Sequence, residues 1–275
     1  MTGTIGGIRT QDGGLGGSGG LPLVLMYHSV APYDEDPYLV TVSPARFEQQ
    51  MRWLHRRGLR GTSMRELLAA RAAGRDRGMV GLTFDDGYAD FARYAVPVLR
   101  RFGFTATAFV VAGRLGGTNA WDEAGARKAL MTAEQVREVA AEGVEIGSHG
   151  LRHAALTSVG IDEIVAEVAN SRALLRQVCG GPVSGFCYPY GEVDAVTVDA
   201  VRAAGYDYGC AIWRSRLTGI HALPRSYVGD RDGSMRLMAK WYRHQITPLT
   251  GLRPARRPAQ ARDDRRRGGR RPQPA

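Results

Sequence analysis

The sequence predicts an α/β fold, a (β/α) barrel with about seven parallel strands. From Leu21 onward, apolar runs rich in β-branched residues alternate with amphipathic segments, which is typical of parallel strands joined by right-handed helical crossovers. About seven strands over roughly 225 residues suit a barrel better than a small open sheet, although the pattern also fits a doubly wound sheet. The expected strands are residues 23–29, 80–84, 105–112, 144–148, 185–190, 206–212 and 223–228.

The helices expected between these strands carry start and stop signals. Ser43 before Pro44 predicts an N-cap with proline at the first helical position. Residues 63–66 and 132–135 fit the capping box, in which a Ser or Thr is followed three positions later by Glu or Gln. Glycine follows four of the periodic segments and predicts their C-terminal ends: Gly58, Gly103, Gly143 and Gly205.

Composition divides the chain into three parts. Residues 1–20 are rich in glycine and predict a flexible arm, residues 21–247 form the expected domain, and residues 248–275 read as a disordered Arg/Pro-rich tail. Residues 253–275 hold nine arginines against two aspartates, so +7 of the net charge of +10 belongs to the tail and +3 to the rest. The tail predicts at most weak electrostatic binding to an anionic surface, and no specific nucleic acid is expected, because no aromatic residues are interleaved with the arginines.

The compartment is expected to be cytoplasmic. Three cysteines without a metal-binding spacing argue against a disulfide framework. The segment 21–26 is too short and poorly flanked for a signal peptide, and no run approaches the length of a membrane span.

Two short strings supply the residue types of a divalent metal site. Asp85 and Asp86 follow a buried-type strand and precede Gly87, which lets the chain turn. His149 and His153 also follow a strand and lie four residues apart, so both rings can reach one metal if the chain makes a helical turn there. Taken singly, Asp86 could instead cap the next helix, and the histidines could be surface residues. Together they provide three ligands and one spare carboxylate, as catalytic zinc sites do.

These strings, with residues 186–191 and 223–225, resemble the motifs of the polysaccharide deacetylases that contain the NodB homology domain (carbohydrate esterase family 4). The resemblance spans roughly residues 21–228 and implies a distorted (β/α) barrel. It implies a hydrolase that removes N-acetyl groups from a carbohydrate and uses one divalent metal, most often Zn²⁺, with Co²⁺, Ni²⁺ or Mn²⁺ as alternatives. Asp86, His149 and His153 would be the ligands, Asp85 the general base, and the backbone N–H of Tyr190 an oxyanion donor.

The sequence departs from the family pattern at two points. Many members carry an arginine in the third motif that orients the catalytic aspartate, whereas residues 184–189 contain none. Many also end with Leu-x-His, whose histidine is the general acid, whereas this chain has Arg225 at that position. We expect Arg225 to take over the orienting role by pairing with Asp85, although a structural salt bridge is an alternative.

The donor of a proton to the leaving amine is therefore open. The Met-Tyr-His string that ends at His28 resembles the branch that acts on poly-N-acetylglucosamine, so His28 is expected to contact substrate or to transfer a proton, with capping or packing as the alternative. His221 is a second candidate. Tyr188, Pro189 and Trp121 are expected to contact the sugar, and Trp213 is expected to pack in the core.

Two other functions compete with a polysaccharide deacetylase. A deacylase of a small nucleotide- or lipid-linked sugar is favoured by the missing leader, and a degenerate carbohydrate-binding protein by the two departures from the family pattern. The intact Asp85, Asp86, His149 and His153 argue against the binding protein. The sequence does not predict an oligomeric state.

Overall fold

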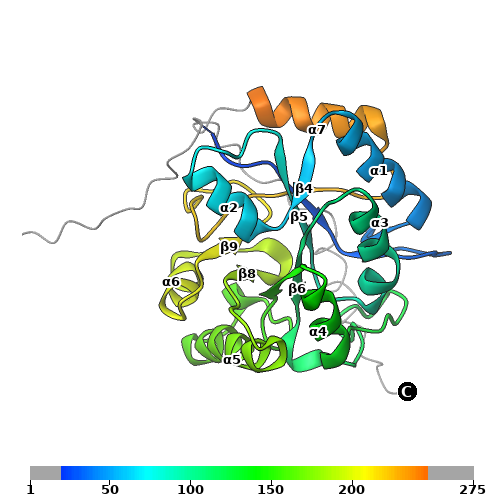
Figure 1. Cartoon of the computed structure of the whole chain (residues 1–275). Coiled ribbons are helices and arrows are strands. Elements are labelled where there is room, and N and C mark those ends of the chain that lie inside the picture. Colours follow the sequence, from blue (N-terminus) through cyan, green and yellow to red (C-terminus); the bar gives the residue numbers. More distant parts are fainter. Residues whose placement is uncertain (1–19, 247–275) are drawn as a thin grey trace, which may run out of the picture.

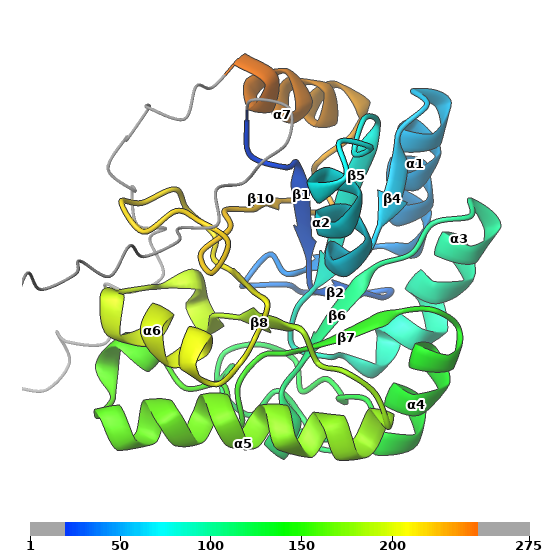
Figure 2. The same cartoon turned by 60° about the vertical axis from the view of Figure 1, so that its left-hand side comes forward.

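The structure, a computed structural model, describes residues 20–246, so the expected arm and tail fall almost entirely outside it. A curled sheet of short parallel strands occupies the centre, and helices cover its outer side (Figures 1 and 2). The helices of the described part are α1 (Pro44–Arg56), α2 (Met64–Ala72), α3 (Val96–Arg101), α4 (Ala133–Ala141), α5 (Ile161–Cys179), α6 (Ala195–Ala203) and α7 (Ser234–Ile246). None of the helices in residues 20–246 is long and apolar enough to cross a bilayer.

The sheet confirms the expected distorted barrel. Its continuous path runs β10 (Ser226–Tyr227), β1 (Val24–Tyr27), β5 (Met79–Phe84), β6 (Thr107–Val110), β7 (Glu145–Ser148), β8 (Gly185–Cys187) and β9 (Tyr208–Cys210), and every pairing is parallel. A parallel bridge between Cys210 and Leu223 links the β9 edge to the segment just before β10. The sheet therefore curls until its two edges nearly meet, which excludes the doubly wound alternative.

Six of the seven expected strands contain a shorter observed one, whereas β5 covers the expected range 80–84 and begins one residue earlier. An eighth strand, β4 (Arg60–Thr62), also pairs with β5 and was not expected, since three residues that include a glycine carry no readable alternation. A separate parallel pair, β2 (Ser29–Val30) and β3 (Thr41–Val42), follows the end of β1.

The helix caps agree with the sequence in part. Thr132 and Gln135 form a reciprocal capping box at α4, and Ser63 accepts a hydrogen bond from the backbone N–H of Glu66 at α2. Ser43 precedes α1 as expected, but its side chain does not cap that helix: its hydroxyl donates to Asp230 instead. The four expected terminal glycines all have positive φ, between 65° and 93°.

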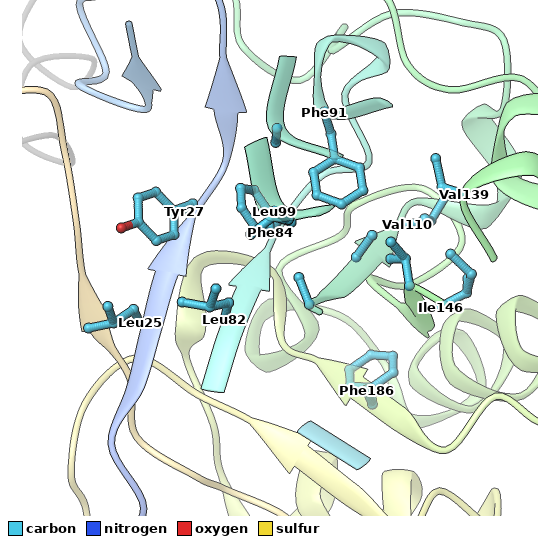
Figure 3. Close-up of a cluster of buried hydrophobic side chains, with 14 of the residues drawn as sticks. Leu25, Tyr27, Leu82, Phe84, Phe91, Leu99, Val110, Val139, Ile146 and Phe186 are labelled. Atoms are coloured by element: carbon cyan, nitrogen blue, oxygen red, sulfur yellow. The ribbon is translucent and has the colours of Figure 1, made fainter. Parts of the chain in front are cut away.

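Aromatic packing fixes the ends of the strands that carry the polar motifs (Figure 3). Tyr27 stacks on Phe84 with ring centroids 5.2 Å apart, and Phe84 contacts Phe91 at 4.6 Å. All three side chains are at most 1% exposed, and burial of each phenylalanine contributes about 1.5–3 kcal/mol. Since Tyr27 precedes His28 and Phe84 precedes Asp85, this core holds the first residues of two site loops in place.

Candidate metal centre

The expected site residues gather at the carboxyl ends of the strands. Asp85 and Asp86 follow β5, His149 follows β7, Tyr190 follows β8 and His28 follows β1. Because these strands are parallel, their carboxyl ends share one edge of the barrel, which is where barrel enzymes place their chemistry.

Asp86, His149 and His153 converge on one point. The Nε2 atoms of both histidines lie 3.3 Å from Oδ1 of Asp86, and the three ligand atoms lie within 4.8 Å of one another. All three side chains are buried, and the two rings are nearly perpendicular with centroids 4.9 Å apart. The two histidines four residues apart therefore lie close enough to serve one site, although the expected helical turn between them is wrong, because the chain makes a loop there.

The hydrogen bonds around these atoms fit a cation. Nδ1 of His149 lies 2.8 Å from the carbonyl oxygen of Cys187, so it donates, and in the neutral form of the ring the lone pair of Nε2 faces Asp86. Oδ1 of Asp86 is buried and lacks a hydrogen-bond partner of good geometry among the described residues. An acceptor nitrogen facing an acceptor oxygen is repulsive unless a positive charge lies between them, and one carboxylate with two imidazoles is a donor set suited to Zn²⁺.

The pKa shifts indicate one shared positive charge. Burial opposes a charged ring at His149, but its contacts with Cys187 and with the carboxylate of Asp86 raise its pKa well above the ordinary value. Burial lowers the pKa of His153, despite the same Asp86. Burial alone would raise the pKa of Asp86, whereas the two imidazole rings, each 3.3 Å from its Oδ1, hold it well below the ordinary value. A divalent cation bound between these groups would supply the positive charge that they share.

Three residues around the centre have left-handed backbone. Asp86 has φ +71°, His153 has φ +66° and Tyr190 has φ +60°. Non-glycine residues rarely adopt this region, and such strain persists mainly at functional sites, where the surrounding structure holds it. These conformations turn the Asp86 and His153 side chains out of the strand or loop direction toward the common point.

Asp85 lies beside that point and pairs with Arg225. The guanidinium donates to both carboxylate oxygens, NH1 to Oδ1 at 2.6 Å and NH2 to Oδ2 at 2.7 Å. Arg225 also donates to the carbonyl oxygen of Ala211 and to the hydroxyl of Thr83, and its side chain is fully buried. Burial would raise the pKa of Asp85, but the charge and hydrogen bonds of Arg225 outweigh it and lower that pKa. Asp85 is therefore a fixed, ionised carboxylate beside the centre.

Asp85, His149 and Cys187 form a second group whose possible ligand atoms also lie within 4.8 Å of one another. A cation there would face the guanidinium of Arg225, which already binds Asp85 and also lies 3.1 Å from Sγ of Cys187. The triplet of Asp86, His149 and His153 is therefore the better metal site.

His28, Tyr190 and Trp121 surround the centre. Nε2 of His28 lies 3.9 Å from Oδ2 of Asp85, and its side chain is 17% exposed. The Trp121 ring stacks on His153 with centroids 4.4 Å apart, while Tyr190 meets the same ring edge-on at 4.8 Å and is 49% exposed. The contact of Trp121 with a metal ligand was not foreseen, because the loop that carries it has no motif.

Three expectations are wrong. The side chains of Tyr188 and Pro189 are buried, so they offer no face to a sugar; the Tyr188 hydroxyl donates to the carbonyl oxygen of His221. His221 cannot protonate a leaving group here, because its Nε2 contacts the carbonyl oxygen of Tyr206, which precedes β9 and so lies toward the opposite end of the strands.

Comparisons with known proteins decide the family. The sequence profile of the polysaccharide deacetylase family matches residues 72–209, half of the chain. The Bacillus subtilis protein YxkH, which carries the same family name, is 30% identical over 210 residues, covering 74% of this chain and 70% of YxkH. The chain belongs to the polysaccharide deacetylase family. It is thus a carbohydrate deacetylase, a hydrolase of carbon–nitrogen bonds other than peptide bonds.

Other proteins match most of the chain in sequence or in fold. The poly-β-1,6-N-acetyl-D-glucosamine N-deacetylase of Staphylococcus aureus is 22% identical over 214 residues, covering 73% of this deacetylase and 72% of the relative. The structure of IcaB from Ammonifex degensii superimposes with a TM-score of 0.67 at 25% identity, over 82% of this chain and 98% of IcaB. The Streptococcus pyogenes deacetylase PplD gives a TM-score of 0.68 at 23% identity, over 80% and 97% of the two chains.

Proposed function

We propose that the protein hydrolyses the N-acetyl groups of a poly- or oligosaccharide of N-acetylglucosamine at a metal centre formed by Asp86, His149 and His153. The observation that carries the proposal is the convergence of two ring nitrogens at 3.3 Å on one otherwise unpartnered carboxylate oxygen. Zinc is the cation that this donor set favours.

When bound, the cation supplies Lewis acidity, which lowers the pKa of a water and polarises the acetyl carbonyl. Asp85 accepts the proton of the attacking water, because it is ionised and lies beside the ligands. Arg225 holds both oxygens of Asp85, which prevents that carboxylate from swinging round to join the ligands.

The remaining steps use groups at the rim. The backbone N–H of Tyr190, in the loop after β8, donates to the oxygen that becomes negative in the tetrahedral state. The C–N bond then breaks, the water's oxygen remains in acetate, and the amine nitrogen takes the proton that Asp85 received. His28 completes the path of that proton, since its Nε2 lies 3.9 Å from Asp85 and its ring is partly exposed.

The substrate class rests on the relatives and on the site together. The Staphylococcus aureus relative is named for poly-β-1,6-N-acetyl-D-glucosamine, and the Met26-Tyr27-His28 string resembles that branch. Trp121 and Tyr190 flank His153 and supply aromatic surface for a sugar ring. A cytoplasmic location remains a prediction.

The test measures acetate release and metal content on the same samples. We expect activity on β-1,6-linked N-acetylglucosamine oligomers above that on chitooligosaccharides and on nucleotide-linked N-acetylglucosamine. Chelation should abolish it, and added Zn²⁺ or Co²⁺ should restore it. His153→Ala should lose both metal and activity. A His153→Ala protein that keeps one metal per chain would rule out the assigned ligands, and a preference for the nucleotide sugar would rule out the polymer.

A further inference from the structure

We propose that Glu167 on α5 is the positioning residue that sets His153 for metal binding. Its side chain is completely buried, although α5 lies on the outside of the barrel (Figure 2). It accepts three hydrogen bonds, all from the two residues that immediately precede His153. The inference rests on the proposed metal site and concerns what holds that site in shape.

The geometry of the carboxylate is that of a backbone clamp. Oε2 accepts from the backbone N–H groups of Leu151 and Arg152 at 2.8 and 2.9 Å, while Oε1 accepts from Nε of Arg152 at 2.8 Å. Two consecutive N–H groups can point at one oxygen only when the chain turns sharply between them. Gly150 permits this turn, with φ +80°, and a Cβ there would lie 3.0 Å from Oε2 of Glu167.

His153 needs this clamp more than His149 does. The ring of His149 is oriented by its hydrogen bond to the carbonyl oxygen of Cys187, the usual support of a metal-binding histidine. Nδ1 of His153 is buried, and within residues 20–246 it has no hydrogen-bond partner. The direction of its ring therefore depends on ring contacts with Trp121 and Tyr190 and on the left-handed backbone at His153. That backbone directly follows Arg152, the last residue that Glu167 holds.

A simple salt bridge does not explain the arrangement. The side chain of Arg152 is 54% exposed, and it also pairs at 2.7 Å with Glu163, which lies on α5 as Glu167 does. An exposed pair of this kind contributes little and does not require a fully buried carboxylate. The two backbone hydrogen bonds account for it, because a fully buried carboxylate is costly unless donors satisfy its oxygens.

The experiment titrates Co²⁺ into the metal-free full-length protein and records both affinity and the visible spectrum of the bound ion. Glu167→Met keeps the length of the side chain and removes the acceptors, and we expect Co²⁺ affinity to fall about 10- to 100-fold with an altered spectrum. Glu167→Gln retains one oxygen for the backbone N–H groups, so we expect a smaller loss, about three- to tenfold. Glu163→Gln is the matched control, because it breaks the other ion pair of Arg152. This variant should bind Co²⁺ with the affinity of the wild type.

The outcomes separate the two proposals. If the wild type binds no Co²⁺, the metal site itself is refuted. If Glu167→Met is folded by circular dichroism and binds Co²⁺ with wild-type affinity and spectrum, the positioning role is refuted. Should Glu167→Met fail to fold, the comparison of Glu167→Gln with Glu163→Gln decides, and equal affinities would overturn the role.

Discussion

Replacing Arg225 with methionine removes the guanidinium that neutralises Asp85 inside the barrel. The structure indicates how large the loss of stability should be. Both oxygens of Asp85 lose a hydrogen-bond partner at 2.6 or 2.7 Å, and the side chains of Asp85 and Arg225 are at most 3% exposed. Breaking a buried ion pair by removing one partner costs about 3–5 kcal/mol. For a domain of this size that lowers Tm by about 6–20 °C, since each kcal/mol shifts Tm by about 2–4 °C.

The assay is a double-mutant cycle in urea unfolding, combined with the rate of acetate release. Asp85→Asn in the Arg225→Met background removes the uncompensated charge, so the double variant should be more stable than Arg225→Met alone, by about 1 kcal/mol or more. Arg225→Lys is the conservative control, because it keeps a charge but cannot bind both oxygens at once; it should retain more stability than Arg225→Met and still lose turnover. An Arg225→Met protein with wild-type stability and wild-type kcat would refute the orienting role.

Two further predictions concern the neighbouring turn. Asp85→Asn should keep the metal, since Asp85 is not a ligand, but lower kcat by about 10²- to 10⁴-fold through loss of the base; unchanged kcat with metal bound would contradict that role. Gly87→Ala should lower the free energy of unfolding by about 1–3 kcal/mol, because φ is +73° and the new Cβ would lie 3.1–3.2 Å from Val110. Gly103→Ala is the control in urea unfolding, because Gly103 has φ +65° but open space around the new Cβ. If both variants lose the same free energy of unfolding, the contact with Val110 contributes nothing.

The sequence predicts the barrel because its main signals are local. Each buried strand is an apolar run, and parallel pairing follows from the helices between runs. The convergence of the candidate ligands is also predictable, because Asp86, His149 and His153 each stand directly after or close behind such a run, at an edge where parallel strands end together. What the sequence lacks is the backbone conformation that aims them. Nothing in the types Asp and His signals the left-handed φ of Asp86 or His153, which the surrounding contacts impose.

The sequence also does not reveal residues that support the site from a distant part of the chain. Glu167 lies in the middle of a periodic helix, where a polar position normally faces solvent. Only the structure shows it fully buried against the loop that begins at His149. Tyr188 and Pro189 show the reverse case: they stand beside the exposed Tyr190, but their side chains are buried.

Arg225 and Cys187 illustrate how a missing motif residue can be replaced from elsewhere. The third motif, at the end of β8, holds no arginine, and the guanidinium instead enters from the segment before β10, 38 residues beyond Cys187. A larger side chain at position 187 would occupy the space beside Asp85, because NH2 of Arg225 lies 3.1 Å from Sγ of Cys187. The small side chain on β8 and the arginine before β10 therefore form one arrangement. That coupling explains why a chain without the usual arginine still presents a paired, ionised Asp85 next to its ligands.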